Sequence, residues 1–367
     1  MSFSFDDLRR FPDFEAPDLR AWDAADRLIL DEAEALLPGA PVTVIGDEFG
    51  ALTLGSLALG AGPVRVHQDS LVGERALQAN ANRAAVAGGF ESLPLARELV
   101  DGARVVLLRL PRSLEALEQI AALIAAHASP EVVVIAGGRI KHMTVTMNEV
   151  LRRHFERLDV SHARQKSRLL TARDPIAGPI IEPRRRFHDD LGLWVVASGG
   201  VFAGTGVDIG TRALLSELTG VPAFETAIDL GSGTGILAAE LKRRNPDATV
   251  IATDRSAAAV ESARLTMAAN ALAVQVVRDD ALAAQPDASA DLIVLNPPFH
   301  TGGAVHSGLA TGLFQAAARV LRPGGELWVV WNSHLAYKDA LRAIVGDTRE
   351  VARTAKFTVT ASVRRSA

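Results

Sequence analysis

The segment AIDLGSGTGILAAEL, residues 227–241, decides how the second half of the chain folds. A short apolar run ends at Leu230, a glycine-rich turn follows it, and an apolar pattern with helical spacing begins at Ile236. The turn contains Gly231, Gly233 and Gly235, and glycines can adopt a positive φ and leave bare backbone beside a ligand. The segment therefore predicts a strand, a ligand-binding turn and a helix, in that order.

Strands and helices continue to alternate after this segment. The expected elements are a strand at 249–253, a helix at 257–270, a strand at 292–295, a helix at 310–321 and a strand at 326–331. Strands separated by segments of helical length indicate a parallel sheet with helices on both faces. In such a sheet, ligands bind at the carboxyl ends of the strands. We therefore search for functional residues at those ends.

The first half of the chain contains a second copy of this pattern. VTVIGDEFGALTLGSL at 42–57 matches the segment at 227–241, and Gly46 and Gly231 are 185 residues apart. Asp69 and Asp254 end the next strands with the same offset. Further strands follow in the same order, with VVLLRLPRS in the place of LIVLNPPFH and VVVIAGGRIKH in the place of LWVVWNSHL. This ordered series indicates an internal duplication.

The two copies differ in the glycine turn. The first copy has Asp47, Glu48 and Phe49 where the second has a serine, a glycine and a threonine. Side chains at these positions block a ligand's approach to the backbone, and the two acids add negative charge. We predict an α/β protein of two tandem Rossmann-like domains, of which the first is degenerate and binds no cofactor.

Helix-breaking residues mark the boundary between the two copies. Pro175, Gly178, Pro179 and Pro183 interrupt regular structure, which predicts a linker near 174–190. We expect a degenerate, substrate-recognising domain at 1–185 and a catalytic domain at 186–367.

Composition excludes several classes of protein. The 367 residues include no cysteine, which excludes disulfides, thiolate zinc sites, iron–sulfur clusters and cysteine nucleophiles, and we expect no metal. Hydrophobic residues make up 48% and charged residues 22%, as in globular proteins. No uncharged run is long enough to cross a bilayer, and MSFSFDDLRRF does not resemble a secretory signal. We expect a cytoplasmic monomer that does not associate with membranes.

Acidic residues at the strand ends favour one cofactor over another. Asp254 lies 19 residues after Gly235, where a carboxylate can accept hydrogen bonds from the ribose hydroxyls of NAD or S-adenosylmethionine. Asp229 would repel the pyrophosphate of a dinucleotide but would attract a ligand with a cationic end. The glycine spacing also departs from G-x-G-x-x-G, because Ile236 follows Gly235. These residues favour S-adenosylmethionine.

Seven residues of the second domain are assigned to this cofactor at or near the glycine turn. Asp280, of the pair Asp279-Asp280, follows the next expected strand and can accept a hydrogen bond from the adenine amine, although a solvated turn is an equal interpretation. The assigned residues are Asp229, Gly231, Ser232, Gly233, Gly235, Asp254 and Asp280. Asn296, at the end of a later strand, is assigned to the cofactor site as well.

The strand at 292–295 is followed by the most specific motif of the chain. Asn296, Pro297, Pro298 and Phe299 form an extended turn in which the Asn296 side-chain oxygen and the Pro297 carbonyl are converging acceptors. Such acceptors can hold both hydrogens of a planar exocyclic amine and stabilise positive charge on its nitrogen. Phe299 offers a surface for stacking a base. No general base is required, and His300 is more readily explained as structural.

A basic segment indicates a nucleic-acid partner. Residues 152–188 contain ten basic residues against four acidic ones, although the whole chain has a net charge of -4. We expect an RNA contact at Arg184, Arg185 and Arg186, with Arg139 and Lys141 of the first domain as further RNA-binding residues. A solvated surface is the other explanation of these charges.

With these motifs in place, residues 199–357 resemble the bacterial ribosomal RNA guanine-N2 methyltransferases of the tandem-domain, class I type. The resemblance rests on GGVFAGTGVDIGTRALL, DLGSGTG, NPPFH and RPGGELWVVWNSHLAYKDAL. VDIGTR and NSHLAY are closer to the enzymes of the large subunit, which implies 23S rather than 16S RNA as the substrate. The family usually has serine and arginine after the phenylalanine of its first segment, whereas Ala203 and Gly204 follow Phe202 here.

Three other classes remain open from the motifs alone. A protein glutamine N5-methyltransferase also uses an Asn-Pro-Pro loop, although it resembles NPPY more than NPPF and lacks a degenerate first domain. A nicotinamide oxidoreductase would leave the residues from Asn296 to Phe299 unexplained. A non-catalytic RNA-binding scaffold would apply if the second domain failed to bind S-adenosylmethionine.

Overall fold

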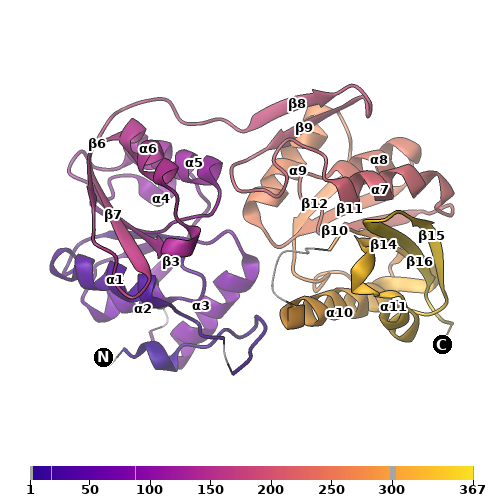
Figure 1. The fold of residues 1–367 in the computed structure, drawn as a ribbon, viewed down its shortest axis with the longest axis horizontal. Coiled ribbons are helices and arrows are strands. Elements are labelled where there is room, and N and C mark those ends of the chain that lie inside the picture. The colour runs from indigo at the N-terminus through magenta and orange to yellow at the C-terminus, as the bar shows by residue number, and fades with distance from the viewer. Residues whose placement is uncertain (1–2, 18, 87, 298–302, 367) are drawn as a thin grey trace. The chain divides into compact units, whose positions relative to one another are not determined.

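The computed structural model describes residues 3–17, 19–86, 88–297 and 303–366. It divides into two compact units, Met1–Glu182 and Pro183–Ala367 (Figure 1). The division falls inside the segment where the prolines predict a boundary.

The first unit is built around one sheet. Its strands are β1 (Val42–Ile45), β2 (Val64–His67), β3 (Phe90–Ser92), β4 (Val105–Arg109), β5 (Val133–Arg139), β6 (Phe155–Val160) and β7 (Ser167–Pro175). Its α-helices are α1 (Ala24–Ala33), α2 (Ala51–Ala58), α3 (Leu71–Arg83), α4 (Arg97–Val100), α5 (Leu114–His127) and α6 (Val145–His154). Short 3-10 turns are η1 (Phe5–Asp7), η2 (Glu34–Leu36) and η3 (Ile140–His142).

The second unit contains a hairpin, a sheet and the helices that cover the sheet. The hairpin is β8 (Arg184–His188) and β9 (Leu193–Ala197), and the sheet is β10 (Thr226–Leu230), β11 (Thr249–Asp254), β12 (Gln275–Arg278), β13 (Ala290–Leu295), β14 (Leu321–Asn332), β15 (Thr348–Arg353) and β16 (Phe357–Val363). The helices are α7 (Ile209–Glu217), α8 (Ile236–Arg244), α9 (Ala257–Ala269), α10 (Gly303–Val320) and α11 (Lys338–Ile344), with 3-10 turns η4 (Leu218–Gly220) and η5 (Ser333–Leu335).

The two sheets have the same topology. Over the described residues each has seven strands, in the order β3-β2-β1-β4-β5-β7-β6 in the first unit and β12-β11-β10-β13-β14-β16-β15 in the second. Five strands of each sheet are parallel, and the last two are antiparallel. The predicted α/β fold and the internal duplication are therefore confirmed.

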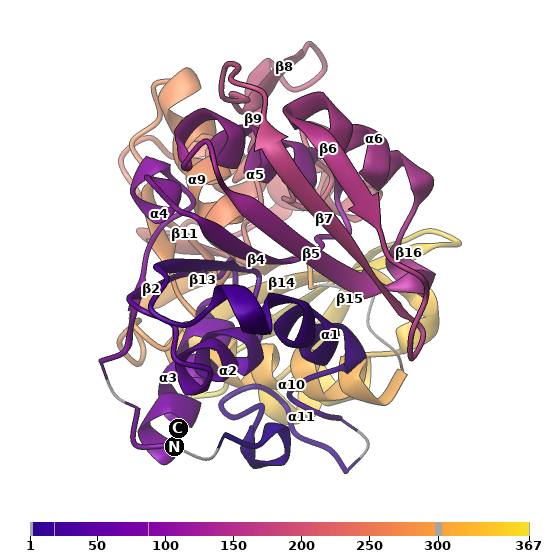
Figure 2. The same ribbon diagram turned by 90° about the vertical axis from the view of Figure 1, so that its left-hand side faces the viewer.

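Both sheets are buried on both faces, which explains why their central strands are continuous apolar runs. In the first unit α1, α2 and α3 pack on one face and α4, α5 and α6 on the other (Figure 2). In the second unit α7, α8 and α9 cover one face, and α10 and α11 cover the other. Successive residues of β14 alternate between the two cores, as Trp328 and Trp331 illustrate.

The segment that we predict to be a linker contains a regular hairpin instead. Arg184 to His188 form β8 and pair in antiparallel register with β9, and β9 packs against α9. The polar side chains of α9 fix the hairpin, because Asn270 bonds both backbone groups of Trp194 and Thr266 bonds those of Val196. The prolines end at 183, so they interrupt the chain only before the hairpin.

Within the described ranges, no helix is both long enough and apolar enough to span a membrane.

Candidate functional site

The glycine turn between β10 and α8 presents bare backbone at the end of the sheet. Gly231 and Gly233 have φ values of 75° and 54°, which disfavour any side chain. A Cβ atom added at either residue would meet no heavy atom within 4 Å, so open space lies beside both. The turn itself is fixed, because the amides of Gly231 and Ser232 donate to the Thr253 carbonyl at 2.8 and 2.9 Å.

The structure gives Gly235 a different role from the other two glycines. A Cβ atom here would lie 2.8 Å from the Met267 side chain and 3.1 Å from that of Ala263. Gly235 therefore allows α8 to approach α9 closely, and it faces protein rather than open space.

Asp229 is a buried carboxylate at the end of β10. Its Oδ2 accepts a hydrogen bond from the Ala238 amide at 3.0 Å, which caps the first turn of α8. Its Oδ1 is buried and has no partner among the described residues. Burial, and to a smaller extent the nearby charge of Asp254, raises the pKa of Asp229 to about 7. A cationic ligand group at Oδ1 would favour the ionised form.

Asp254 lies at the end of β11, beside the glycine turn. Its Oδ2 accepts from the Gly233 amide at 3.0 Å and its Oδ1 from the Ser256 amide at 2.9 Å. The carboxylate therefore fixes the turn and is only half-buried, so its remaining lone pairs can accept hydrogen bonds from a ligand.

The Asp279-Asp280 pair divides into two roles. Asp279 is buried, and its carboxylate accepts from the amides of Asp280 at 2.8 Å and Ala284 at 3.0 Å. It stabilises the turn after β12. Asp280 is half-buried and remains the candidate for a contact with a ligand.

Asn296 follows β13, the strand next to β10. Its Nδ2 donates to Asp208 Oδ2 at 3.2 Å and to Thr211 Oγ1 at 3.0 Å, whereas its Oδ1 is buried and has no described partner. Pro297 directly follows it. Pro298, Phe299 and His300, the rest of the predicted catalytic motif, lie outside the described residues.

Three unpartnered acceptors lie at the carboxyl ends of neighbouring strands. Asp229 Oδ1, Ser232 Oγ and Asn296 Oδ1 are all buried and lack hydrogen-bond partners in the described structure. Buried polar atoms are rarely left unpaired, since each costs about 1–3 kcal/mol. Carboxylate, hydroxyl and amide oxygens suit a ligand that has several donors and a positive charge, and S-adenosylmethionine fits this description.

The corresponding turn of the first unit is filled by its own side chains. Asp47, which is buried, accepts from the Gly50 amide at 3.0 Å, the Thr53 amide at 2.8 Å and the Thr53 hydroxyl at 2.7 Å. It therefore caps α2 from the turn, whereas Asp229 caps α8 from the preceding strand. The strand residue that corresponds to Asp229 is Val44, which is buried in the apolar core.

Arg109 takes the place of Asn296 in the first unit. Leu108 pairs with Ile45 as Leu295 pairs with Leu230, so Arg109 and Asn296 come next in their strands. Arg109 donates to both oxygens of Asp23, at 2.7 and 3.1 Å, and its Nη1 lies 3.1 Å from an oxygen of Asp26. The N-terminal segment thus supplies two carboxylates to this edge of the first sheet.

These side chains leave little space at the edge. A cavity of about 90 Å³ remains, lined by Asp23, Asp26, Asp47 and Arg109 among others. Burial raises the pKa of Asp26 to about 7, although the charge of Arg109 opposes this shift. Burial also raises the pKa of Asp47.

One predicted correspondence between the two units is wrong by a residue. The Gly46 amide donates to the His67 carbonyl at 3.0 Å, as that of Gly231 does to Thr253 at 2.8 Å. The residue that corresponds to Asp254 is therefore Gln68, not Asp69. The turn before α3 and the turn before α9 differ in register from the glycine turns, which a constant offset of 185 conceals. The first unit thus lacks the acidic residue at the end of its second strand.

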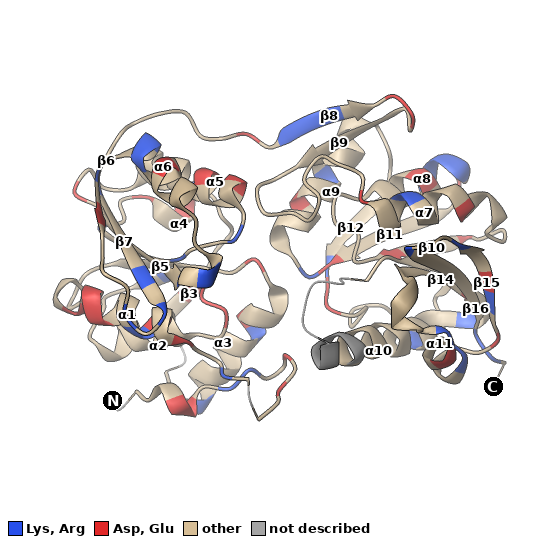
Figure 3. Ribbon diagram, in the orientation of Figure 1, with Lys and Arg blue, Asp and Glu red and all other residues tan. Residues whose placement is uncertain are grey.

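The hairpin of the second unit brings aromatic side chains to the three arginines. Arg185 lies over the Trp194 ring, 4.4 Å from its centroid, and the ring centroids of Phe187 and Trp194 are 5.2 Å apart. Phe187 is 41% exposed, and Arg184, Arg185 and Arg186 are all exposed. Figure 3 shows β8 as a continuous basic strand.

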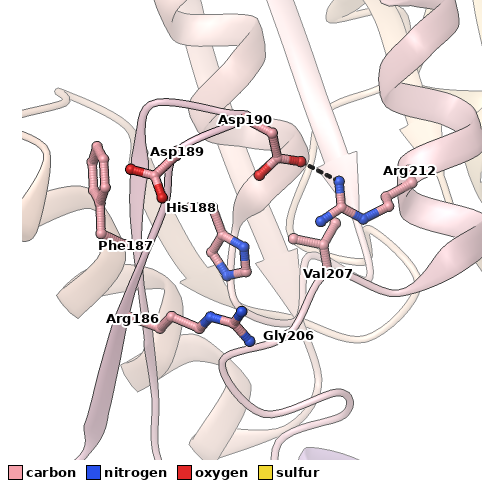
Figure 4. A pocket seen from close by; sticks show the side chains of 8 residues that line it. All are labelled: Arg186, Phe187, His188, Asp189, Asp190, Gly206, Val207 and Arg212. Carbon is pink, nitrogen blue, oxygen red and sulfur yellow. Dashed lines mark hydrogen bonds and ion pairs between the residues drawn. The ribbon is translucent and has the colours of Figure 1, made fainter.

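A pocket of about 480 Å³ opens at the base of the hairpin (Figure 4). Arg186 and His188 line it from β8, and Gly206 lines it from the loop before α7. Asp190 and Arg212 form an ion pair at its rim. His188 bonds the Thr205 carbonyl at 2.7 Å, which attaches the hairpin to this loop.

Comparison with known proteins agrees with this geometry. Residues 1–175 match the family model "RLMG N-terminal domain", and residues 192–361 match "Methyltransferase small domain". Ribosomal RNA large subunit methyltransferase G of Streptomyces coelicolor is 38% identical over 371 residues, which is 97% of each chain. The protein of the same name from Pseudomonas entomophila is 37% identical over 96% of each chain.

The chain belongs to the ribosomal RNA large subunit methyltransferase G family. The predicted resemblance to tandem-domain ribosomal RNA methyltransferases, and to the large-subunit branch, is confirmed. The chain also has the fold of the Thermus thermophilus 16S rRNA N2 G1207 methyltransferase, a structure in complex with AdoMet and guanosine. That similarity has a TM-score of 0.78 at 23% identity, over 96% of this chain and 95% of the other.

Two residues that contact Asn296 in this member of the family are absent from the sequence-based assignment. Asp208 and Thr211 begin α7 in the segment GVDIGTR, which contributes to the resemblance but not to the assigned residues. They lie 88 and 85 positions before Asn296, so only the tertiary structure brings them to it. Their one sequence signal is that an acid and a hydroxyl begin a helix.

The departure from the family pattern after Phe202 also has a structural counterpart. Ala203 and Gly204 both adopt positive φ, at 63° and 54°, in a turn closed by a hydrogen bond from Gly206 to Ala203 at 2.9 Å. Phe202 is 57% exposed beside this turn.

Proposed function

We propose that this protein transfers a methyl group from S-adenosylmethionine to the exocyclic N2 amine of a guanine in the 23S RNA of the large ribosomal subunit. The observation that carries this proposal is its similarity, over 97% of both chains, to a ribosomal RNA large subunit methyltransferase G. The unpartnered acceptors after β10 and β13 support it independently, because they suit a cationic cofactor and an amine substrate.

Residues of the glycine turn and the neighbouring strand ends hold the cofactor. Asp229 Oδ1 accepts from its cationic amino-acid end, and Asp254 accepts from its ribose hydroxyls. Gly231, Ser232 and Gly233 present bare backbone and one hydroxyl beside open space. Asp280 accepts from the adenine amine, and Gly235 acts indirectly by packing α8 on α9. When bound, S-adenosylmethionine supplies an electrophilic methyl group on a sulfonium.

Asn296 and Pro297 hold the target amine. The Asn296 Oδ1 and the Pro297 carbonyl each accept one hydrogen of the guanine N2 amine, which directs the nitrogen lone pair out of the base plane. As the carbon–nitrogen bond forms and the carbon–sulfur bond breaks, positive charge develops on nitrogen beside these two oxygens. The amine then loses one proton to solvent, so no general base is needed.

Pro298 and Phe299 complete the proposed catalytic motif. Pro298 keeps the turn extended, and Phe299 stacks on the guanine. Asn296 also borders the cofactor site, since β13 pairs directly with β10. Both assignments to Pro298 and Phe299 rest on the sequence.

The first domain, at 1–185, recognises the RNA and binds no cofactor, and catalysis takes place in the domain at 186–367. The filled turn supports this division: Asp47 occupies the place of open backbone, and Arg109 stands in the place of Asn296. The division of the structure after Glu182 lies close to this boundary.

Two basic surfaces contact RNA. The first is the hairpin with Arg184, Arg185 and Arg186, where Phe187 and Trp194 add the aromatic surfaces on which unpaired bases stack.

The second surface lies on the first domain and includes Arg139 and Lys141. Partial burial and three nearby cations lower the pKa of His142, which supports a concentration of positive charge there. The cations are Arg112, Lys141 and Arg139.

We further propose that the protein acts as a monomer in the cytoplasm, where it meets ribosomal RNA.

The test is methylation of 23S RNA taken from cells that lack the gene. Purified protein and labelled S-adenosylmethionine should yield N2-methylguanosine at one site in this RNA, and RNA from wild-type cells should accept little label. Label in 16S RNA or in protein glutamine, with none in 23S RNA, would contradict the proposed substrate.

A further inference from the structure

The side chain of Asn296 is held from one side only. Its Nδ2 donates to Asp208 Oδ2 at 3.2 Å and to Thr211 Oγ1 at 3.0 Å, which uses both amide hydrogens. Its Oδ1 has no partner in the described structure. If the amide were rotated by 180°, Oδ1 would face a carboxylate oxygen, and two acceptors would repel one another. The contacts therefore determine which atom of Asn296 is left free.

Helix α7 supplies this arrangement through its first residues. Asp208 is the N-cap residue, and its Oδ2 also accepts from the amides of Gly210 at 2.8 Å and Thr211 at 3.3 Å. The carboxylate is thus fixed by the helix before it receives the Asn296 amide. Since α7 packs on β14 and β16, the helix is held against the same sheet that carries Asn296.

Gly210 gives the free oxygen its space. A Cβ atom at this residue would lie 3.1 Å from Asn296 Oδ1 and 3.0 Å from Asp208 Oδ2. Any larger residue would crowd both atoms. The sequence Asp208-Ile209-Gly210-Thr211 thus supplies a fixed acceptor, a gap and a second acceptor around one amide.

The carboxylate also affects the charge on the free oxygen. A hydrogen bond to an anionic acceptor is stronger than a neutral one and polarises the group that donates it. Asp208 therefore draws positive charge toward Nδ2 and increases the negative charge on Oδ1. An amine that becomes cationic beside Oδ1 is stabilised by this polarisation more than the neutral amine is.

We propose that Asp208 and Thr211 are positioning residues for methyl transfer, which fix the Asn296 amide so that Oδ1 accepts the hydrogen of the target amine. This inference rests on the proposed function, because it assumes that Asn296 Oδ1 binds the amine. It predicts an effect on the rate of transfer at saturating substrate and none on cofactor affinity.

The test compares Thr211→Val with Thr211→Ser in the full-length protein. Valine keeps the shape of threonine but removes the acceptor, and the Asn296 amide then keeps one of its two bonds. We expect kcat to fall about tenfold in Thr211→Val and to recover to within about twofold of wild type in Thr211→Ser. The dissociation constant for S-adenosylmethionine, measured by calorimetry, should be unchanged in both.

Asp208→Asn measures the contribution of charge. Asparagine can keep an oxygen toward the α7 amides and Asn296, so the contacts remain while the anion is lost. A fall in kcat of about fivefold, with an unchanged melting temperature and an unchanged KM for RNA, would support polarisation by Asp208. Wild-type kcat in Asp208→Asn would overturn that part of the proposal.

Combination with Asn296→Ala separates positioning from a general structural effect. If Thr211 acts through Asn296, Thr211→Val should lower kcat no further once Asn296 is alanine. An equal tenfold loss in both backgrounds would overturn the proposal. Failure of the wild-type protein to methylate 23S RNA in the same assay would instead refute the proposed function, whatever the variants do.

Discussion

The glycine turn of the second unit and its counterpart in the first have the same backbone path and opposite content. Gly46 and Gly231 both have positive φ and both donate to the end of the next strand. In the second unit open space lies beside the turn, and three buried acceptors face it unpaired. In the first unit Asp47 turns inward and all of its contacts are satisfied within the protein. The comparison teaches that a ligand site can be lost while the fold that carried it is kept.

The sharpest test of this comparison replaces Asn296 and Arg109, which occupy the same position in the two sheets. Asn296→Ala should lower kcat by about 10² or more and leave cofactor affinity nearly unchanged, because the hydrogen bond that it removes acts in the transition state. Single-turnover transfer of labelled methyl to 23S RNA measures the rate. Arg109→Ala is the matched control and should retain kcat in the protein that remains folded. Loss of cofactor binding in a folded Asn296→Ala variant would contradict our assignment of Asn296 to the target amine.

Arg109→Ala should instead reduce stability. Removing the guanidinium leaves Asp23 and Asp26 without their cation, and we expect the first unit to lose about 2 kcal/mol, discounted for the partial exposure of the pair. Urea unfolding followed by tryptophan fluorescence measures this, since Trp22 lies beside the cluster. The double variant Arg109→Met with Asp23→Asn should recover part of the loss. Unchanged stability would mean that the cluster is only a surface ion pair.

The fold was predictable from the sequence to the extent that it depends on local pattern. Apolar runs and the glycine turn predicted β10 and α8, and the expected helix at 310–321 differs from α10 mainly in where it begins. The hairpin was not predicted, because three consecutive arginines do not alternate with apolar residues in the way that signals a strand. Its stability comes from Asn270 and Thr266 of α9, which are distant in sequence.

The candidate site was predictable where one residue type has one physical use. The glycines of the turn and the acids at 229 and 254 follow from backbone freedom and from charge. Asp208 and Thr211 could not be found, since a helix N-cap has the same residue types whether or not it also holds another side chain. The one-residue error at Asp69 arose because spacing along a chain does not reveal where a turn gains a residue.

Cofactor stoichiometry gives a third test of the comparison. Calorimetry on the full-length chain should show one S-adenosylmethionine per molecule, and Asp254→Ala should weaken binding by about tenfold or more because it removes a ligand acceptor and releases Gly233. Gln68→Ala, the matched change in the first unit, should leave the affinity unchanged. A second binding event, or one that survives a strongly weakened Asp254→Ala site, would show that the first unit also binds the cofactor.

The buried carboxylate of the second unit should make this affinity depend on pH. Asp229 has a folded-state pKa raised to about 7, so a cationic ligand that needs the ionised form binds more weakly below that pH. We expect affinity to rise about fivefold between pH 6 and pH 7, with release of protons on binding. Calorimetry in buffers of different ionisation enthalpy measures the protons, and Asp229→Asn should abolish their release. A flat profile in the wild type would exclude a cation at Asp229.

The smallest expected effect is on RNA binding. Reversal of Arg184, Arg185 and Arg186 to glutamate should weaken binding and flatten the slope of log affinity against log salt by about 0.7 for each phosphate that the hairpin no longer binds. The control reverses Arg97, Arg104 and Arg353, which form exposed ion pairs and change the net charge equally. Equal weakening in both triple variants would indicate a dependence on overall charge rather than binding at the hairpin.

The inward turn of Asp47 has a consequence for the history of the chain. Once a turn residue capped α2, the acid on the preceding strand was free to become Val44, and the apolar core then closed around it. Restoring the acid at position 44 alone would bury a second carboxylate close to the first. Removing Asp47 alone would leave α2 uncapped. Each single step back is unfavourable, so loss of the first site is an evolutionary ratchet, and a lineage that needs a second active centre would more easily duplicate the C-terminal half again than repair this one.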